Sequence, residues 1–160
     1  MPALAAHGMP TVAVTVHDEL PDVEARLVDA GLGIANDGAA PLHEVRPLSC
    51  FARLASGAIA GGAVGRTWGL CCELQQLWVD PAHRRRGIGR QLLSAFHERA
   101  EARGCRTFYL ETFSFQAPAL YRALGYVVRL EIAGFAPGVV KYTMVRSVAP
   151  TPEEVRGRGG

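Results

Sequence analysis

Residues 84–89 read Arg-Arg-Arg-Gly-Ile-Gly and stand where a strand pattern gives way to a helix pattern. The strand pattern over residues 74–79 ends at an Asp-Pro turn, and from Gly87 the apolar residues recur at helical spacing until Gly104. Glycines at the start of a helix let an anion approach the backbone, where unpaired N–H groups and the helix dipole attract it. The arginines add charge and bidentate donors. The stretch predicts a pyrophosphate cradle, although an arginine run before a helix is also typical of a solvated turn.

Two phosphate-binding motifs are excluded by their spacing. A Walker loop needs GxxxxGK[ST] and a dinucleotide fingerprint needs GxGxxG, and neither pattern occurs at this loop. The remaining pattern is Arg-x-x-Gly-x-Gly, which begins at Arg84.

Length, composition and charge limit the class of protein. The 160 residues and 49% hydrophobic content suit one domain, which we expect over residues 1–148, with a disordered tail over residues 149–160. A formal net charge of +2 is too small to indicate nucleic acid as the main partner. No apolar run approaches the ~20 residues that span a bilayer, and the first residues lack a signal-peptide pattern. We expect a cytoplasmic protein with no membrane partner.

The cysteines and histidines show no metal-binding arrangement. The four cysteines have no CxxC spacing and no pairing with histidine that suits zinc, so we expect reduced, mostly buried thiols and no metal. We expect surface positions for the histidines, which are His7, His17, His43, His83 and His97.

The first half of the chain predicts a helix and an antiparallel meander. A β-branched run at residues 11–16 predicts a strand, and the pattern after it predicts a helix that Asp18 caps and Gly31 ends. Three further strands are predicted, at residues 48–54, 59–68 and 70–79. Their connections are too short for a parallel return, so they are expected to pair antiparallel.

The second half alternates helices and strands. The predicted order is helix 87–103, strand 107–112, helix 116–124, strand 126–131 and strand 141–146. The helix between strands 70–79 and 107–112 favours a parallel crossover. The sequence therefore predicts an α/β fold, α+β in some schemes, with a mixed sheet.

The motifs and their order resemble those of the GNAT N-acetyltransferase superfamily. Leu-Trp-Val-Asp-Pro at residues 77–81, followed by Arg-x-x-Gly-x-Gly, resembles its cofactor motif. Glu-Thr-Phe-Ser-Phe-Gln-Ala-Pro at residues 111–118, with Leu-Tyr-x-x-Leu-Gly-Tyr at 120–126, resembles its second motif. The combination is similar to a bacterial subgroup of small enzymes whose substrates are mostly unassigned. The likeness covers residues 11–146 and implies the GNAT fold: a mixed central sheet with an antiparallel N-terminal meander, splayed parallel strands and flanking helices.

The resemblance implies acetyl-CoA as co-substrate and no metal. Its pantetheine arm would lie between parallel strands that splay near Val79 and Thr112, where amides can satisfy open backbone groups. The N–H of Val79 would polarise the thioester carbonyl. The implied cofactor-binding residues are Leu77, Trp78, Val79, Arg84, Arg85, Arg86, Gly87, Ile88, Gly89, Arg90 and Gln116. Gln116 stands where the family often has an asparagine.

The resemblance also implies two catalytic residues. Tyr121 matches the family's general acid, which protonates the departing thiolate, although a tyrosine there also suits simple core packing. Glu73 stands where several members carry a base that deprotonates the amine; a solvated strand charge or a water chain remains an equal alternative. The subgroup's histidine before the last strand is replaced by Val139, which predicts a different acceptor.

The sequence therefore predicts an N-acetyltransferase that moves an acetyl group from acetyl-CoA to a primary amine of a small molecule. Transfer is expected to be direct, within a ternary complex. Two alternatives stay open: acetylation of a protein or peptide amine, and a non-catalytic acyl-CoA-binding module. Nucleic acid is disfavoured as a partner because no aromatic residues interleave with the arginines. A homodimer is left open.

Overall fold

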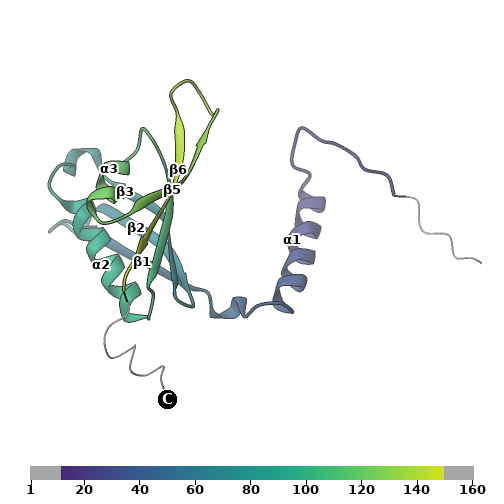
Figure 1. The fold of residues 1–160 in the computed structure, drawn as a ribbon, viewed down its shortest axis with the longest axis horizontal. Helices are drawn as coiled ribbons and strands as arrows, with labels where there is room; N and C mark the ends of the chain where they lie inside the picture. The colour runs from purple at the N-terminus through teal and green to yellow at the C-terminus, as the bar shows by residue number, and fades with distance from the viewer. Residues whose placement is uncertain (1–11, 150–160) are drawn as a thin grey trace, which may run out of the picture. The chain divides into compact units, whose positions relative to one another are not determined.

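The computed structural model describes residues 12–149 (Figure 1). The chain divides after Leu42 into an N-terminal and a C-terminal compact unit, Met1–Leu42 and His43–Gly160. Residues 1–11, which include the first residue of the predicted strand 11–16, and residues 150–160, which include most of the predicted tail, lie outside the described part. None of the helices within residues 12–149 is long and apolar enough to cross a membrane.

The N-terminal unit contains one helix, α1 (Asp22–Asp37), within its described residues. The predicted strand is wrong for residues 12–16, which form no strand. A β-branched run favours extended backbone, but a strand also needs a neighbour for its hydrogen bonds.

The predicted helix exists with different ends: it begins after Pro21, without a side-chain cap from Asp18, and continues through Gly31. A glycine inside a helix costs only about 1 kcal/mol relative to alanine, so Gly31 by itself does not end the helix.

The C-terminal unit is built on a six-stranded sheet with the order β1-β2-β3-β4-β6-β5. The parallel β3–β4 pair is joined through α2, whereas the other neighbouring pairs are antiparallel. The predicted mixed α/β sheet is therefore confirmed. The strands are β1 (Arg46–Arg53), β2 (Ile59–Trp68), β3 (Cys71–Val79), β4 (Thr107–Phe113), β5 (Val127–Ala133) and β6 (Val140–Ser147). The helices are η1 (Leu42–Glu44) at the boundary between the units, η2 (Pro81–His83), α2 (Ile88–Ala102) and α3 (Pro118–Ala123).

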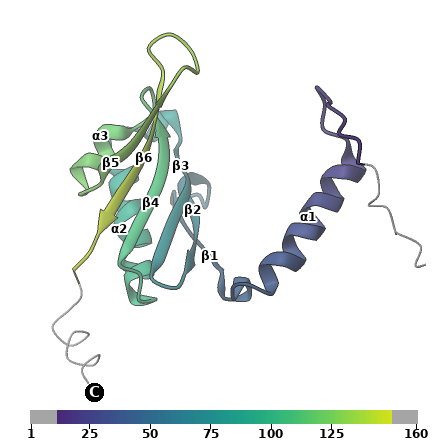
Figure 2. The ribbon, with the colours of Figure 1, turned by 45° about the vertical axis from the view of Figure 1, so that its right-hand side comes forward.

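The core lies between the sheet and helices α2 and α3, which occupy the same side in both views (Figure 2). Phe96 of α2, Phe108 of β4 and Met144 of β6 are almost fully buried there.

All four cysteines are free thiols; Cys72 and Cys105 are buried. Burial raises the pKa of Cys72 to about 12, so this thiol stays protonated.

His97 is a buried residue, so the prediction of a surface position is wrong for it. It lies on the face of α2 that carries Leu93 and Ala100, which are also buried. Its Nε2 and the Tyr126 hydroxyl are hydrogen-bonded at 2.7 Å. Burial, with a smaller contribution from Arg146, lowers the pKa of His97 to about 4. The imidazole is therefore a neutral polar group of the core.

A β-bulge in β3 changes which side chains face the core. Gly65 of β2 pairs with Leu74, but the next residue, Val64, pairs with Gln76, so Gln75 is extra. Leu74 is consequently buried, and beyond the bulge Leu77 packs against the core. Gly65 is required at this point, because a Cβ there would lie 1.9 Å from the Glu73 carbonyl oxygen.

We predict that Gly65→Ala destabilises the C-terminal unit by about 3 kcal/mol, since the added methyl group overlaps backbone that cannot move aside. Urea unfolding followed by tryptophan fluorescence measures this, because both tryptophans, Trp68 and Trp78, lie in this unit. Gly33→Ala is the matched control: its Cβ meets nothing within 4 Å. Equal unfolding midpoints for the two variants would contradict the role of Gly65.

Candidate active site

The site begins where β3 and β4 stop pairing. Their parallel ladder runs from Cys71 and Thr107 to Leu74 and Leu110 and then ends, although β3 continues to Val79. The predicted splay is therefore present, and it starts at the bulge. Backbone groups beyond the last pair have no strand partner across the gap, and a ligand with amides can supply one.

The direction of these open groups follows from strand alternation. The N–H of Asp80 donates to the Ala60 carbonyl of β2 at 2.9 Å. Successive residues of a strand point their polar groups to opposite sides, so the N–H groups of Val79 and Leu77 face away from β2, toward the gap. The carbonyl of Val79 faces there too, and it accepts a hydrogen bond from Nε of Arg84 at 3.0 Å.

A cavity of about 810 Å³ occupies the gap. Its size suits a cofactor or small-molecule ligand. Tyr121 lines it, and so do ten of the eleven predicted cofactor-binding residues: Leu77, Trp78, Val79, Arg84, Arg85, Gly87, Ile88, Gly89, Arg90 and Gln116. Arg86 is exposed and does not line the cavity.

The loop before α2 forms the polar end of the cavity. The Asp80 carboxylate accepts from the Ala82 N–H at 2.8 Å and so caps η2. Arg85 has a φ of 59° and Gly87 a φ of 78°, both left-handed. Gly87 precedes α2 without a side-chain cap, which leaves the N–H groups of the first turn for another acceptor. Together with the arginine charges, this geometry fits a pyrophosphate.

Gln116 has a structural role that the sequence did not predict. Its Oε1 accepts from the Phe113 N–H at 2.8 Å and from the Thr112 hydroxyl at 3.1 Å, which fixes the turn after β4. Among residues 12–149 its Nε2 has no partner, so the amide keeps its donors for a ligand in the cavity.

Tyr121 enters the cavity from α3. Its ring is 7% exposed and packs edge-on against Tyr126, with centroids 5.9 Å apart. Its hydroxyl has no hydrogen-bond partner within residues 12–149. Burial raises the pKa of Tyr121, which keeps the phenol protonated at neutral pH, as a proton donor requires.

Comparison with known proteins agrees with this architecture. The profile of the acetyltransferase (GNAT) family matches residues 20–126. The chain belongs to the GNAT acetyltransferase family. It is 35% identical over 112 residues to the blasticidin-S acetyltransferase of Streptomyces morookaense, covering 68% of this chain and 82% of that protein. This GNAT protein is therefore an acyltransferase enzyme.

Solved structures of acetyltransferases share the GNAT fold of this chain. An acetyltransferase from Bacillus cereus superposes with a TM-score of 0.72 and 24% identity, over 84% of this chain and 98% of that one. Nourseothricin acetyltransferase superposes with a TM-score of 0.55 and 26% identity, over 65% of each chain.

The structure does not bring Glu73 of this GNAT protein to the cavity. Arg66 is its register partner on β2, and Nε of Arg66 donates to the Glu73 carboxylate at 2.6 Å. Glu73 is absent from the cavity wall, whereas Glu111 of β4 forms part of it. Strand alternation could have indicated the orientation of Glu111 from the sequence. Glu111 lies between Leu110 and Thr112 on a predicted strand, so its side chain faces the opposite side of the sheet from theirs.

We predict that acetyl-CoA raises the melting temperature of this GNAT protein and that Gly89→Val abolishes the shift. A Cβ at Gly89 lies 3.4 Å from Leu120 and 3.8 Å from Val79, so further methyl groups would fill the cavity between α3 and β3. Thermal unfolding with and without millimolar acetyl-CoA measures this.

Gly89→Ala is the control for this prediction, because its single methyl group makes only ordinary van der Waals contact. It should keep most of the shift, and circular dichroism should show both variants folded. A full shift in Gly89→Val would show that acetyl-CoA does not occupy the cavity beside Gly89.

Proposed function

We propose that this enzyme transfers the acetyl group of acetyl-CoA to a primary amine of a small molecule, by direct attack within a ternary complex. The observation that carries the proposal is the open β3–β4 gap, whose cavity is lined both by the arginine loop and by Tyr121. One cavity thus joins an anion-binding end to a proton donor.

The chain has groups suited to each part of the co-substrate. The N–H groups at the start of α2, with Arg84 and Arg85, would hold the pyrophosphate. The backbone of Leu77 and Val79 would pair with the pantetheine amides, as a neighbouring strand does. Nε2 of Gln116 would donate to the same arm.

The chemical step requires few protein groups. The acceptor ammonium first loses a proton to water, and the neutral amine attacks the thioester carbon. The carbon–sulfur bond then breaks, the thiolate takes a proton from Tyr121, and water takes the proton that the nitrogen of the new amide loses. The Val79 N–H would stabilise the oxyanion that forms on the thioester carbonyl. Holding both reactants in one cavity supplies much of the rate, so no covalent intermediate is required. We assign no base on the protein, because Glu73 is held by Arg66 outside the cavity.

The amine class is supported by relatives rather than by the cavity alone. Two similar proteins are known as blasticidin-S acetyltransferase and nourseothricin acetyltransferase. We therefore propose a small-molecule amine over a protein amine, and place blasticidin S and nourseothricin first among the compounds to test.

The experiment is a screen for thiol released from acetyl-CoA, using these two compounds, other small amines and a peptide with a free N-terminus. We predict amine-dependent release with at least one small molecule, and product carrying one added acetyl group by mass spectrometry. Release with the peptide alone would overturn the choice of acceptor. No amine-dependent release, together with a normal acetyl-CoA thermal shift, would instead indicate a non-catalytic binding module.

We predict that Tyr121→Phe lowers turnover at least ~10-fold, toward the range of ~10² to 10⁴ usual for acid–base groups, with the KM for acetyl-CoA little changed. Tyr126→Phe is the matched control: its hydroxyl bonds His97 in the core, so its loss should cost about 1 kcal/mol of stability and leave turnover intact. Full turnover in Tyr121→Phe would exclude Tyr121 as the acid.

A further inference from the structure

The gap between β3 and β4 opens on both faces of the sheet. Leu110 and Thr112 are buried on the side of α2, and Glu111 between them points to the opposite face while still lining the cavity. On β3 the bulge places Gln76 and Trp78 on that same opposite face, and both line the cavity as well. An amine can therefore reach the gap from the face away from the arginine loop.

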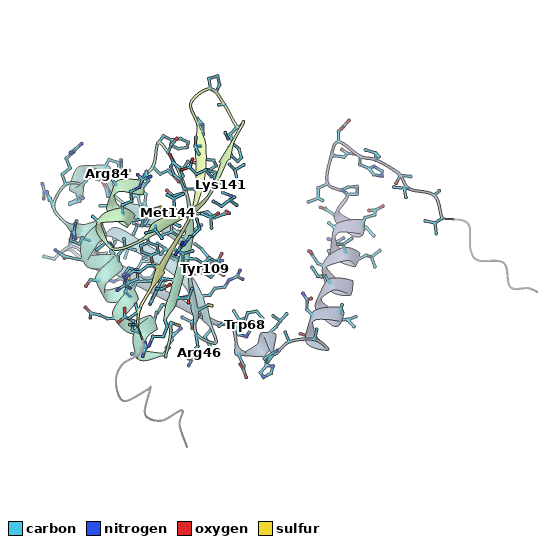
Figure 3. All side chains as sticks on the ribbon, in the orientation of Figure 1. Arg46, Trp68, Arg84, Tyr109, Lys141 and Met144 are labelled. Atoms are coloured by element: carbon cyan, nitrogen blue, oxygen red, sulfur yellow. The ribbon has the colours of Figure 1, made fainter. Side chains whose placement is uncertain are left out.

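A carboxylate paired with an ammonium stands at this second opening. Lys141 of β6, which is labelled in Figure 3, forms an ion pair with Glu111 on the neighbouring strand β4. The side chain of Glu111 is 52% exposed and that of Lys141 27%. The pair is accessible to water, so its net strength is small and a competing cation can replace Lys141.

Three phenylalanines pack together, and one of them, Phe113, lies beside this ion pair. Phe113 is on the same face of β4 as Glu111 and is the register partner of Lys141. Its ring stacks on Phe115 with centroids 5.3 Å apart and planes 8° apart, and it meets Phe135 edge-on at 5.2 Å. Phe115 is 69% exposed and also lines the cavity. We call Glu111, Lys141 and these three rings the acceptor mouth.

We propose that the acceptor mouth binds a primary amine that is joined to a flat aromatic ring by a short chain. The ring stacks on Phe115, and the protonated amine takes the place of the Lys141 ammonium beside Glu111. Glu111 and Phe113 are two apart on one strand face and so lie about 7 Å apart, and Phe115 stacks on Phe113, which places the aromatic surface within reach of a short chain from the ion pair. An exposed, stacked aromatic surface favours a planar partner.

This inference rests on the proposed acetyltransferase function and adds the acceptor's class and its binding residues. The probes are 2-phenylethylamine and 2-cyclohexylethylamine, which match in chain length and in charge but differ in planarity. Acetyl transfer is followed by thiol release at a fixed, saturating acetyl-CoA concentration.

The ion pair gives the first arm of the test. Glu111→Gln should raise the KM for 2-phenylethylamine about tenfold, because the ammonium loses its charged partner. Lys141→Met should lower the same KM severalfold, because Glu111 is freed from its internal competitor. A purely structural ion pair predicts the same direction in both variants, so KM values that move together or not at all would overturn the proposal.

The aromatic surface gives the second arm. Phe115→Leu should reduce kcat/KM for 2-phenylethylamine about fivefold and change that for 2-cyclohexylethylamine by less than twofold. Phe51→Leu is the matched control, since Phe51 is a half-exposed ring on β1 that does not line the cavity. Equal losses with the two amines in Phe115→Leu would contradict a stacking role.

The outcomes separate this inference from the proposed function. An acetyl-CoA thermal shift equal to that of the wild type shows that each variant is folded and binds co-substrate. If the wild-type protein acetylates other small amines but not 2-phenylethylamine, the acceptor mouth is wrong and the acetyltransferase proposal stands. If it acetylates no amine, both fail.

Discussion

The end of the β3–β4 ladder at Leu74 and Leu110 is the constraint on which the rest of the site depends. Two parallel strands normally satisfy each other's backbone groups, and here the pairing stops while both strands continue. The bulge at Gln75 coincides with this point, and Gly65 opposite it leaves room for the Glu73 carbonyl. A single extra residue thus turns a closed sheet into one with an internal, ligand-sized opening.

The two ends of the opening have different chemistry because they lie on different faces of the sheet. On the helix side, the start of α2 contributes N–H groups and arginines, and α3 contributes Tyr121. On the far side, the wall contains Glu111 and exposed aromatic rings. A thioester held through the gap would therefore meet a proton donor from one face and an amine from the other.

Local pattern predicted the sheet and the helix-side residues well, because alternation, turn residues and the Arg-x-x-Gly-x-Gly loop are all short-range signals. Strand Ile59–Trp68 has the predicted bounds. Features that depend on tertiary partners were not predictable: residues 12–16 lack a neighbouring strand, and His97 is buried by packing against Phe108 and Tyr126. The resemblance suggested Glu73 as the base, and only strand register shows that Arg66 holds Glu73 and that Glu111 lines the cavity instead.

The central claim is that the open edge of β3 pairs with acetyl-CoA. Amide-resolved hydrogen exchange by NMR, with and without saturating CoA, tests it most directly, since the N–H groups of Leu77 and Val79 face the gap while that of Asp80 already bonds β2. We predict that exchange at Leu77 and Val79 slows at least ~10-fold with CoA, whereas amides of the β1–β2 pairing are unchanged. Unprotected amides at Leu77 and Val79 in protein that demonstrably binds CoA would contradict the account.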